Sequence, residues 1–163
     1  MTALLSERKT GIYVDVQNIY YTTKEVFNRQ FDYRAFWRNL SDNNKLIIAN
    51  AYAIDRGIAT QEKFQAALRY IGFDVKLKPY ISRADGSAKG DWDVGIVIDI
   101  IKNAPELDRI VLLSGDGDFD LLVNYVRDAY DIGVDVYGVS ALTANSLKHS
   151  ADRFYPIDET FLL

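Results

Sequence analysis

The sequence predicts an α/β domain with a parallel sheet that is covered by helices on both faces. Short apolar runs rich in β-branched residues alternate along the chain with stretches in which apolar residues have helical spacing. Such alternation is typical of βαβ units, whose strands are parallel and buried. The chain has 163 residues, of which 48% are hydrophobic, enough for one domain with its own core. We therefore expect residues 1–163 to form a single domain.

The individual elements follow from these two patterns. Apolar runs predict five strands, at Gly11–Val16, Leu46–Ile54, Asp74–Tyr80, Arg109–Leu113 and Val134–Val139. Apolar residues at i, i+3, i+4 and i+7 predict three helices, with stripes at Phe64, Ala67, Leu68 and Ile71, at Val94, Val97, Ile98 and Ile101, and at Leu122, Tyr125, Val126 and Ala129. Gly72 and Gly133 follow the first and third of these helices, and each is expected to be the left-handed residue that ends its helix.

Composition excludes several classes of site. The chain has no cysteine and a single histidine, His149, which rules out disulfide scaffolds, thiolate zinc sites and multi-histidine metal sites. We expect His149 to be exposed on a helix. Any bound metal must be held by oxygen ligands, which favours a hard cation such as Mg²⁺ or Mn²⁺. The net charge of −4 disfavours a protein that coats nucleic acid without specificity.

No feature of the sequence indicates a membrane protein. No apolar run approaches the ~20 residues that a membrane-spanning helix needs. The polar stretch at residues 1–10 has no apolar core of the kind found in secretory signals. We therefore expect a cytoplasmic protein.

Carboxylates follow the predicted strands or open a predicted helix. In an open α/β sheet, ligands bind beyond the carboxyl ends of the strands. Asp15 ends the first strand, Asp116 and Asp118 follow the fourth, and Asp93 stands where a helix begins. Carboxylates brought together repel, and a divalent cation relieves the repulsion while activating water toward phosphorus. The four aspartates are the predicted metal ligands, and the amide of Asn18 is expected to orient water or phosphate.

Spacing leaves some of these roles open. Asp91 competes with Asp93, because both precede the same helix. Asp99 lies ~240° around that helix from Asp93 and ~9 Å along it, so sharing one ion is difficult and a substrate role is the alternative. Each aspartate could also be structural, as a turn residue or a helix N-cap.

Charge and aromatic residues are unevenly distributed. Residues 63–89 contain six basic and two acidic residues, whereas residues 91–135 contain eleven acidic and three basic ones. This pattern indicates either solvated surfaces or an acidic pocket beside a basic approach. Aromatic residues gather after the first strand, and they predict a packed core or, where exposed, a homodimer interface. They are Tyr20, Tyr21, Phe31, Tyr33, Phe36 and Trp37.

Four segments together resemble the NYN domain family and, within it, the LabA-like branch. They are Asp15-Val-Gln-Asn18, Lys89-Gly90 with Asp93 and Asp99, Ser114-Gly-Asp116-Gly-Asp118-Phe119, and Gly138 to Phe154 with Ser140, Leu147, Ala151 and Asp152. The resemblance implies a PIN-like, Rossmann-like α/β/α sandwich with strand order 3-2-1-4-5, in which Asp15 and Asp116 flank the central switch point. Family members are similar to metal-dependent ribonucleases.

The resemblance also implies roles for individual residues. It favours Asp93 over Asp91, adds Asp99 as a further acidic position, and makes Asn18 and Ser114 polar helpers. The expected metal ligands are Asp15, Asp93, Asp116 and Asp118, and Lys89 and Ser114 are expected to bind substrate. The basic stretch of residues 63–89, rather than the resemblance, adds Lys78 and Arg83 as expected substrate-binding residues.

The leading hypothesis is therefore a metal-dependent ribonuclease. Metal chemistry would cleave the phosphodiester bond, basic residues would hold phosphates, and Tyr80 could stack on a base. Two alternatives remain: a binding or regulatory module that holds metal, nucleotide or RNA without turnover, and a phosphatase for small phosphoesters.

Overall fold

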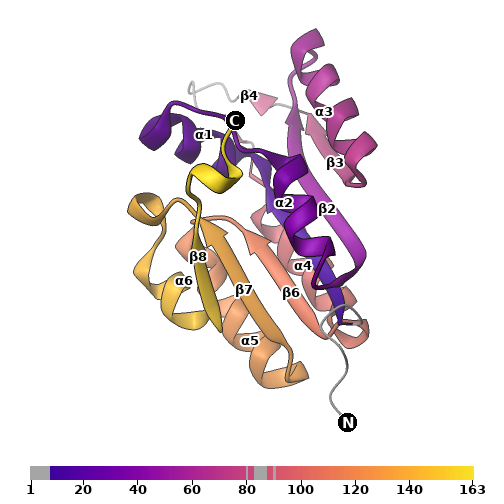
Figure 1. The fold of residues 1–163 in the computed structure, drawn as a ribbon, viewed down its shortest axis with the longest axis vertical. Helices are drawn as coiled ribbons and strands as arrows, with labels where there is room; N and C mark the ends of the chain where they lie inside the picture. The colour runs from indigo at the N-terminus through magenta and orange to yellow at the C-terminus, as the bar shows by residue number, and fades with distance from the viewer. Residues whose placement is uncertain (1–7, 80, 83–87, 90) are drawn as a thin grey trace.

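A twisted parallel sheet runs through the middle of the molecule, with helices on both of its faces (Figure 1). The computed structural model describes residues 8–79, 81–82, 88–89 and 91–163. The predicted positions Tyr80 and Arg83 lie outside the described residues. Lys89 lies in a short strand, but its side chain is outside the described part of the structure.

The predicted strands and helices are present, with small shifts at their ends. The strands are β1 (Lys9–Asp15), β2 (Lys45–Asp55), β3 (Asp74–Pro79), β4 (Ile81–Ser82), β5 (Ala88–Lys89), β6 (Arg109–Leu113), β7 (Gly133–Gly138) and β8 (Arg153–Pro156). The α-helices are α1 (Val16–Phe27), α2 (Tyr33–Ser41), α3 (Ala59–Ile71), α4 (Asp93–Asn103), α5 (Asp120–Tyr130) and α6 (Asn145–Ser150). Short 3₁₀ helices join some of them: η2 (Ala104–Glu106), η3 (Gly117–Phe119), η4 (Ser140–Leu142) and η5 (Glu159–Phe161).

The main sheet confirms the expected order and adds one strand. Its order is β3-β2-β1-β6-β7-β8, and all neighbours are parallel. The first five strands reproduce the order 3-2-1-4-5, so the ends of β1 and β6 lie side by side. The strand β8 was not predicted, because four partly exposed residues ending in proline carry little strand signal. Strands β4 and β5 form a separate antiparallel pair.

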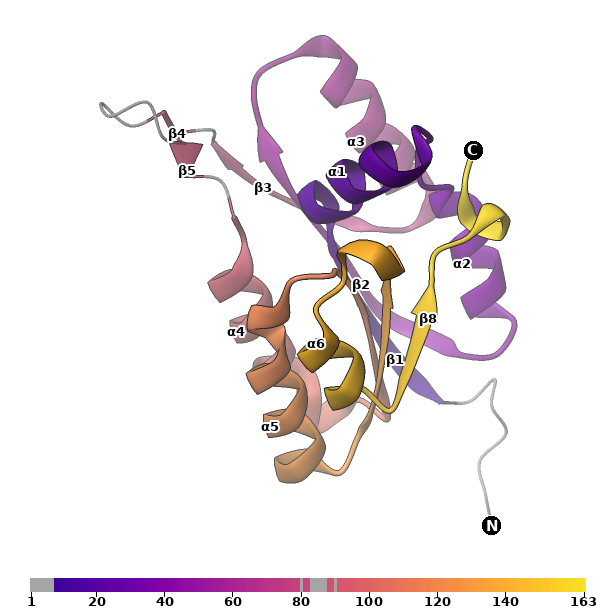
Figure 2. The ribbon, with the colours of Figure 1, turned by 90° about the vertical axis from the view of Figure 1, so that its left-hand side faces the viewer.

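Each face of the sheet has its own hydrophobic core. Figure 2 shows the helices that lie on the two sides of the sheet. Ile12 and Val14 pack on the side of α1, α2 and α3, whereas Tyr13 between them packs on the side of α4, α5 and α6. The alternation follows from the two-residue period of a strand. It leaves the strands buried on both faces and holds their carboxyl ends in fixed register.

The predicted helix stripes are only partly correct. On α4 the buried residues are Ile96 and Ile100, whereas Val94 and Ile98 are 69% and 57% exposed. On α3 and α5 the residues Leu68, Leu122 and Val126 are buried as predicted, but their partners are exposed or half-buried. Those partners are Phe64, Ala67, Ile71, Tyr125 and Ala129. Helix α4 is apolar on most sides, so the spacing of its apolar residues cannot indicate which side faces the sheet.

Most of the aromatic cluster is core. Phe31, Tyr33 and Phe36 are buried, and edge-to-face contacts join Phe31 to the other two. Only Tyr20 and Tyr21 are substantially exposed, at 47% each. The cluster therefore fixes α2 against the sheet. The buried rings are core, and the homodimer interface stays a prediction for the exposed pair Tyr20 and Tyr21.

The two predicted helix-ending glycines behave differently. Gly72 caps α3 with φ at 136°, as expected. After α5, however, the left-handed residue is Asp131 with φ at 53°, and Gly133 already belongs to β7. Asp tolerates this conformation better than most residues, so the prediction for Gly133 was wrong by two positions.

We expect Gly72→Ala to destabilise the fold by about 2–4 kcal/mol, because it combines left-handed strain with overpacking. An added Cβ would lie 2.7 Å from the Trp37 ring. Gly57→Ala is the matched control: φ there is 70° and nothing lies within 4 Å of the added Cβ, so strain alone should cost about 1 kcal/mol. Urea unfolding measures both. Equal losses would show that the Trp37 contact contributes nothing.

Candidate acidic centre

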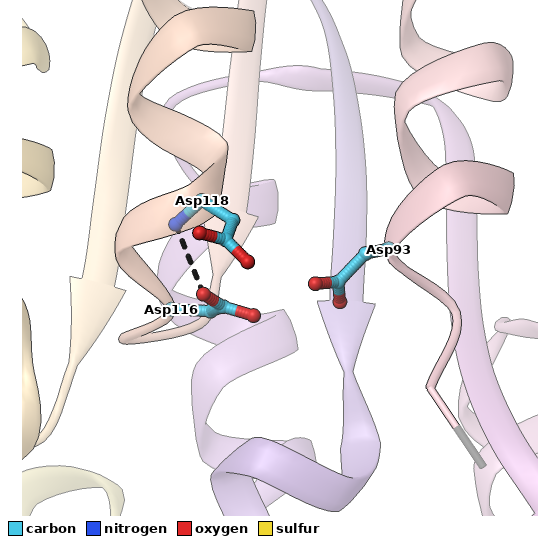
Figure 3. A group of neighbouring side chains, drawn as sticks. All are labelled: Asp93, Asp116 and Asp118. Carbon is cyan, nitrogen blue, oxygen red and sulfur yellow. Dashed lines mark hydrogen bonds between the residues drawn. The ribbon is translucent and has the colours of Figure 1, made fainter. Parts of the chain in front are cut away.

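Three aspartates from two separate parts of the chain meet at the carboxyl edge of the sheet. Asp93 is the first residue of α4, and Asp116 and Asp118 lie in the segment after β6. One carboxylate oxygen from each lies within 4.8 Å of the others. Figure 3 shows the three carboxylates turned toward one another, with Asp93 facing the other two. Asp93 and Asp116 are partly buried and Asp118 is exposed, so the group opens to solvent.

The backbone holds Asp116 in place. Asp116 is the N-cap of η3, and its Oδ1 accepts a hydrogen bond from the Asp118 N–H at 2.9 Å. The sequence left open that these aspartates serve only as helix caps. Asp116 does cap η3, and it also belongs to the carboxylate group. One oxygen of Asp116 fixes the turn, while the carboxylate as a whole still faces Asp93.

Asp15 lies beside this group and is tied to it through Ser114. Ser114 Oγ donates to Asp15 Oδ2 at 3.0 Å and accepts from the Asp116 N–H at 3.2 Å. Asp15 Oδ1 also accepts from the Asn18 N–H at the start of α1, at 3.4 Å. Asp15 is not a member of the close carboxylate group, which contains three of the four expected ligands.

Two expected polar helpers turn out to be positioning residues. Asn18 Oδ1 accepts from the Gly115 N–H at 2.9 Å, so its carbonyl oxygen joins α1 to the segment after β6. Ser114 is fully buried and its two hydrogen bonds are internal, so its expected contact with substrate stays a prediction. Together they connect the ends of β1 and β6, which are neighbours in the sheet.

Burial and neighbouring carboxylates raise the pKa of Asp93 and of Asp15. Burial, a hydrogen bond with Asp116 and the negative charges around it raise the pKa of Asp93 to about 8. Burial and the charges of Asp116 and Asp91 raise the pKa of Asp15 to about 6, against the hydrogen bonds from Ser114 and Asn18. None of the ion pairs recorded between described residues involves Asp15, Asp93, Asp116 or Asp118. The negative charge of the centre is therefore not balanced by a described lysine or arginine.

This donor set fits a hard divalent cation. Three carboxylate oxygens at mutual distances below 4.8 Å can share one ion, and such ions take carboxylates together with water. A cation would also relieve the repulsion that raises the pKa of Asp93. Asp93, Asp116 and Asp118 are the residues that would hold it.

The remaining acidic candidates have structural partners. Asp91 Oδ1 accepts from the Asp93 N–H at 3.2 Å, so it supports the first turn of α4 while Asp93 joins the group. Asp99 Oδ2 accepts from the Tyr52 hydroxyl at 2.7 Å. Asp99 is outside the close carboxylate group, and its hydrogen bond with Tyr52 ties α4 to β2. His149 is exposed on α6, as predicted.

Of the basic residues expected to bind substrate, Lys78 is the one whose side chain the structure describes, and it lies at the carboxyl edge of the sheet. Its Nζ donates to the Asp91 carbonyl at 3.3 Å and lies 4.5 Å from the centre of the Trp92 ring. Trp92 in turn donates from Nε1 to the Ala53 carbonyl at 2.8 Å. Sequence reasoning missed Trp92, although a tryptophan directly before a candidate ligand is a usable signal. It connects Asp93 to the end of β2.

Comparison with known proteins places the chain in a family. A model of the NYN domain matches residues 9–158, which include every element of the main sheet. The chain belongs to the NYN domain family. Its acidic centre lies where β1, β6 and the start of α4 meet. Among the described helices, none is both long and apolar enough to cross a membrane.

Two relatives extend this result. The NYN chain is 26% identical over 159 residues to the low amplitude and bright protein LabA of Synechococcus elongatus, covering 93% of this chain and 84% of that protein. A crystal structure of a Vibrio parahaemolyticus protein of unknown function matches with a TM-score of 0.93 and 49% identity, over the whole of both chains. The similarity to LabA confirms the resemblance seen in the motifs. Family, fold and acidic group together fit a nuclease.

We expect Asp93→Asn to stabilise the metal-free protein, because it removes a charge from a repelling group. The pKa of Asp93 is 3.8 when unperturbed and about 8 here, so between these values the folded protein holds a proton that the unfolded chain has lost. Stability therefore falls as pH rises through this window, and the variant should lose that part of the fall. At pH 8 we expect Tm to rise by roughly 2–4 °C, or ~1 kcal/mol after allowing for solvent screening.

Asp128→Asn is the control for this measurement, because Asp128 is exposed on α5. Thermal unfolding of both variants and the parent is followed across pH in the presence of a chelator. A Tm for Asp93→Asn that stays at or below the parent at pH 8 would contradict the repulsion argument.

Proposed function

We propose that residues 1–163 act as one NYN domain that hydrolyses RNA phosphodiester bonds with the help of Mg²⁺ or Mn²⁺. The observation that carries the proposal is the group of Asp93, Asp116 and Asp118, whose charge no described cation balances. Its position at the switch point of a parallel sheet is where α/β proteins bind ligands. Membership of the NYN family supports a phosphodiester as the substrate.

The three carboxylates divide the work of holding the ion. Asp116 and Asp118 come from one turn, and Asp93 faces them from α4, so the site is assembled only when α4 and the segment after β6 are both in place. When bound, a divalent cation supplies Lewis-acid charge at a phosphate oxygen and lowers the pKa of a coordinated water. Asp93 must give up its proton to serve as a ligand, so binding competes with protonation.

Residues around the group keep it in shape. Ser114 and Asn18 fix the segment that carries Asp116, and Asp15 adds a further negative charge within Coulombic reach of Asp93. Asp15 is the remaining residue of the expected ligand set, and we propose that it supports the ion from the β1 side. Lys78 lies beside the start of α4, where its ammonium can contact a backbone phosphate.

The test is cleavage of labelled single-stranded and hairpin RNA with Mg²⁺ or Mn²⁺. We expect Asp116→Asn to lower the cleavage rate at least 100-fold, roughly the loss of ~3 kcal/mol of electrostatic stabilisation. The wild-type rate should vanish with a chelator and return when metal is added. Asp128→Asn, on the far turns of α5, should cleave at the wild-type rate.

Other outcomes would replace the proposal. Equal residual activity in wild type and Asp116→Asn would show that a contaminant cuts the RNA. Metal binding in calorimetry without hydrolysis of any RNA would favour a regulatory module. Release of phosphate from mononucleotides, with RNA left intact, would favour a phosphatase.

A further inference from the structure

A large groove lies beside α1. It has a volume of about 780 Å³ and is bounded by α1, α3 and the end of β2. These elements lie together at the upper end of the molecule in Figure 1. The proposed hydrolysis at the acidic centre leaves this groove without a role. The volume falls in the range of ~300–1,000 Å³ that is typical of pockets for small ligands.

Aromatic rings and positive charges line the groove. Tyr20 and Tyr21 are each 47% exposed, and their rings contact edge to face at 5.3 Å. Among the described residues, the lining contains three cations, Lys24, Arg56 and Lys63, and no aspartate or glutamate. The chain has a net charge of −4, so a positively charged lining next to the acidic centre is opposite in sign to the protein as a whole. Rings and cations together suit a ligand with a flat base and a phosphate.

Gln65 points to a ligand independently. It lies on α3, lines the groove, and is only 6% exposed. Its side-chain amide has no hydrogen-bond partner among the described residues. The amide atoms are open to the groove rather than fully enclosed, and a bound group with one donor and one acceptor would pair with them. The edge of a nucleobase offers this pair of groups.

The groove adjoins the acidic centre at two points. Val16 and Gln17 line it directly after Asp15, at the start of α1. Ala53 lines it at the end of β2, and its carbonyl accepts the hydrogen bond from Trp92, the residue before Asp93. A strand whose phosphate lies at the acidic centre can therefore reach the groove with a neighbouring nucleotide.

We propose that this groove binds one unpaired nucleotide of the RNA strand next to the bond that is cut. The inference rests on the proposed function, because it takes RNA as the substrate. Tyr21 and Tyr20 stack on the base, Gln65 pairs with its edge, and Lys63 and Lys24 contact the backbone. Paired bases cannot enter, since stacking and pairing occupy both their faces and their edges. The groove thus selects single-stranded RNA.

The experiment measures binding of a short fluorescent single-stranded RNA by anisotropy, with Mg²⁺ and in the Asp116→Asn background, where cleavage is blocked. Tyr21→Ala and Gln65→Leu should each raise the Kd about tenfold, the size of one lost base stack or base contact. The same changes in the wild-type background should raise the KM for RNA by a similar factor. A duplex of the same sequence should bind weakly and show no change with either variant.

Two measurements guard the result. Tyr125→Ala is the matched control, because Tyr125 is 51% exposed on α5, away from the groove, and its Kd should equal that of the parent. Thermal unfolding shows whether Gln65→Leu is folded, as expected for a substitution that keeps the size of the buried side chain. If this variant does not fold, the Kd of Tyr21→Ala alone tests the groove, because Tyr21 is half-exposed.

Several outcomes would overturn the inference. Unchanged Kd in Tyr21→Ala and Gln65→Leu, or an equal loss in Tyr125→Ala, would exclude the groove. A free mononucleotide that binds as tightly as the RNA, and is not displaced by it, would assign the groove to small nucleotides. A dimer that Tyr21→Ala converts to monomer would assign it to a second copy of the chain.

The outcomes separate this inference from the proposed function. Loss of RNA binding in Tyr21→Ala without hydrolysis by wild type under any metal would reject the nuclease and keep the groove as an RNA site. Cleavage that depends on Asp116 but not on Tyr21 or Gln65 would keep the nuclease and reject the groove.

Discussion

Repulsion between carboxylates at one edge of the sheet is the constraint around which this protein is arranged. Asp93, Asp116 and Asp118 are held within a few ångströms of one another, and Asp15 lies close enough to feel their charge. The fold opposes this repulsion with hydrogen bonds that fix the backbone around the carboxylates. The N–H groups of Asn18 and Asp118 point at carboxylate oxygens, so the charge is stabilised by local dipoles where no described cation pairs with it.

The rest of the fold makes that arrangement possible. β1 and β6 are central strands, buried on both faces, and their parallel pairing sets the ends that carry Asp15 and Ser114 side by side. Ser114 then bridges Asp15 and Asp116 from a fully buried position. Because the Ser114 hydroxyl is buried and hydrogen-bonded to both residues, the pairing of β1 and β6 determines how far Asp15 lies from Asp116. The free energy that this repulsion costs is offset by the two hydrophobic cores on the faces of the sheet.

The sequence was sufficient for the features that depend on strand ends and order. Asp15, Asp93, Asp116 and Asp118 follow strands or begin a helix, and the motif resemblance supplied the strand order that brings them together. It was insufficient where packing decides. The spacing on α4 favoured Val94 and Ile98 as buried residues, yet Ile96 and Ile100 are the buried ones. Because α4 is apolar on most sides, the spacing does not determine its buried side, and it does not predict the bond from the Tyr52 hydroxyl to Asp99.

The groove escaped prediction for a related reason. Its residues come from α1, β2 and α3, and no single stretch of sequence shows that Tyr21 and Gln65 line one space. Helix α1 nevertheless links the groove to the acidic centre. It starts at Asp15, whose carboxylate caps it, and its next two turns carry Tyr20, Tyr21 and Lys24 into the groove. A single helix therefore links the position of the acidic centre to that of the aromatic rings. If RNA occupies both, the distance between them determines which phosphate, counted from the bound base, meets the acidic centre.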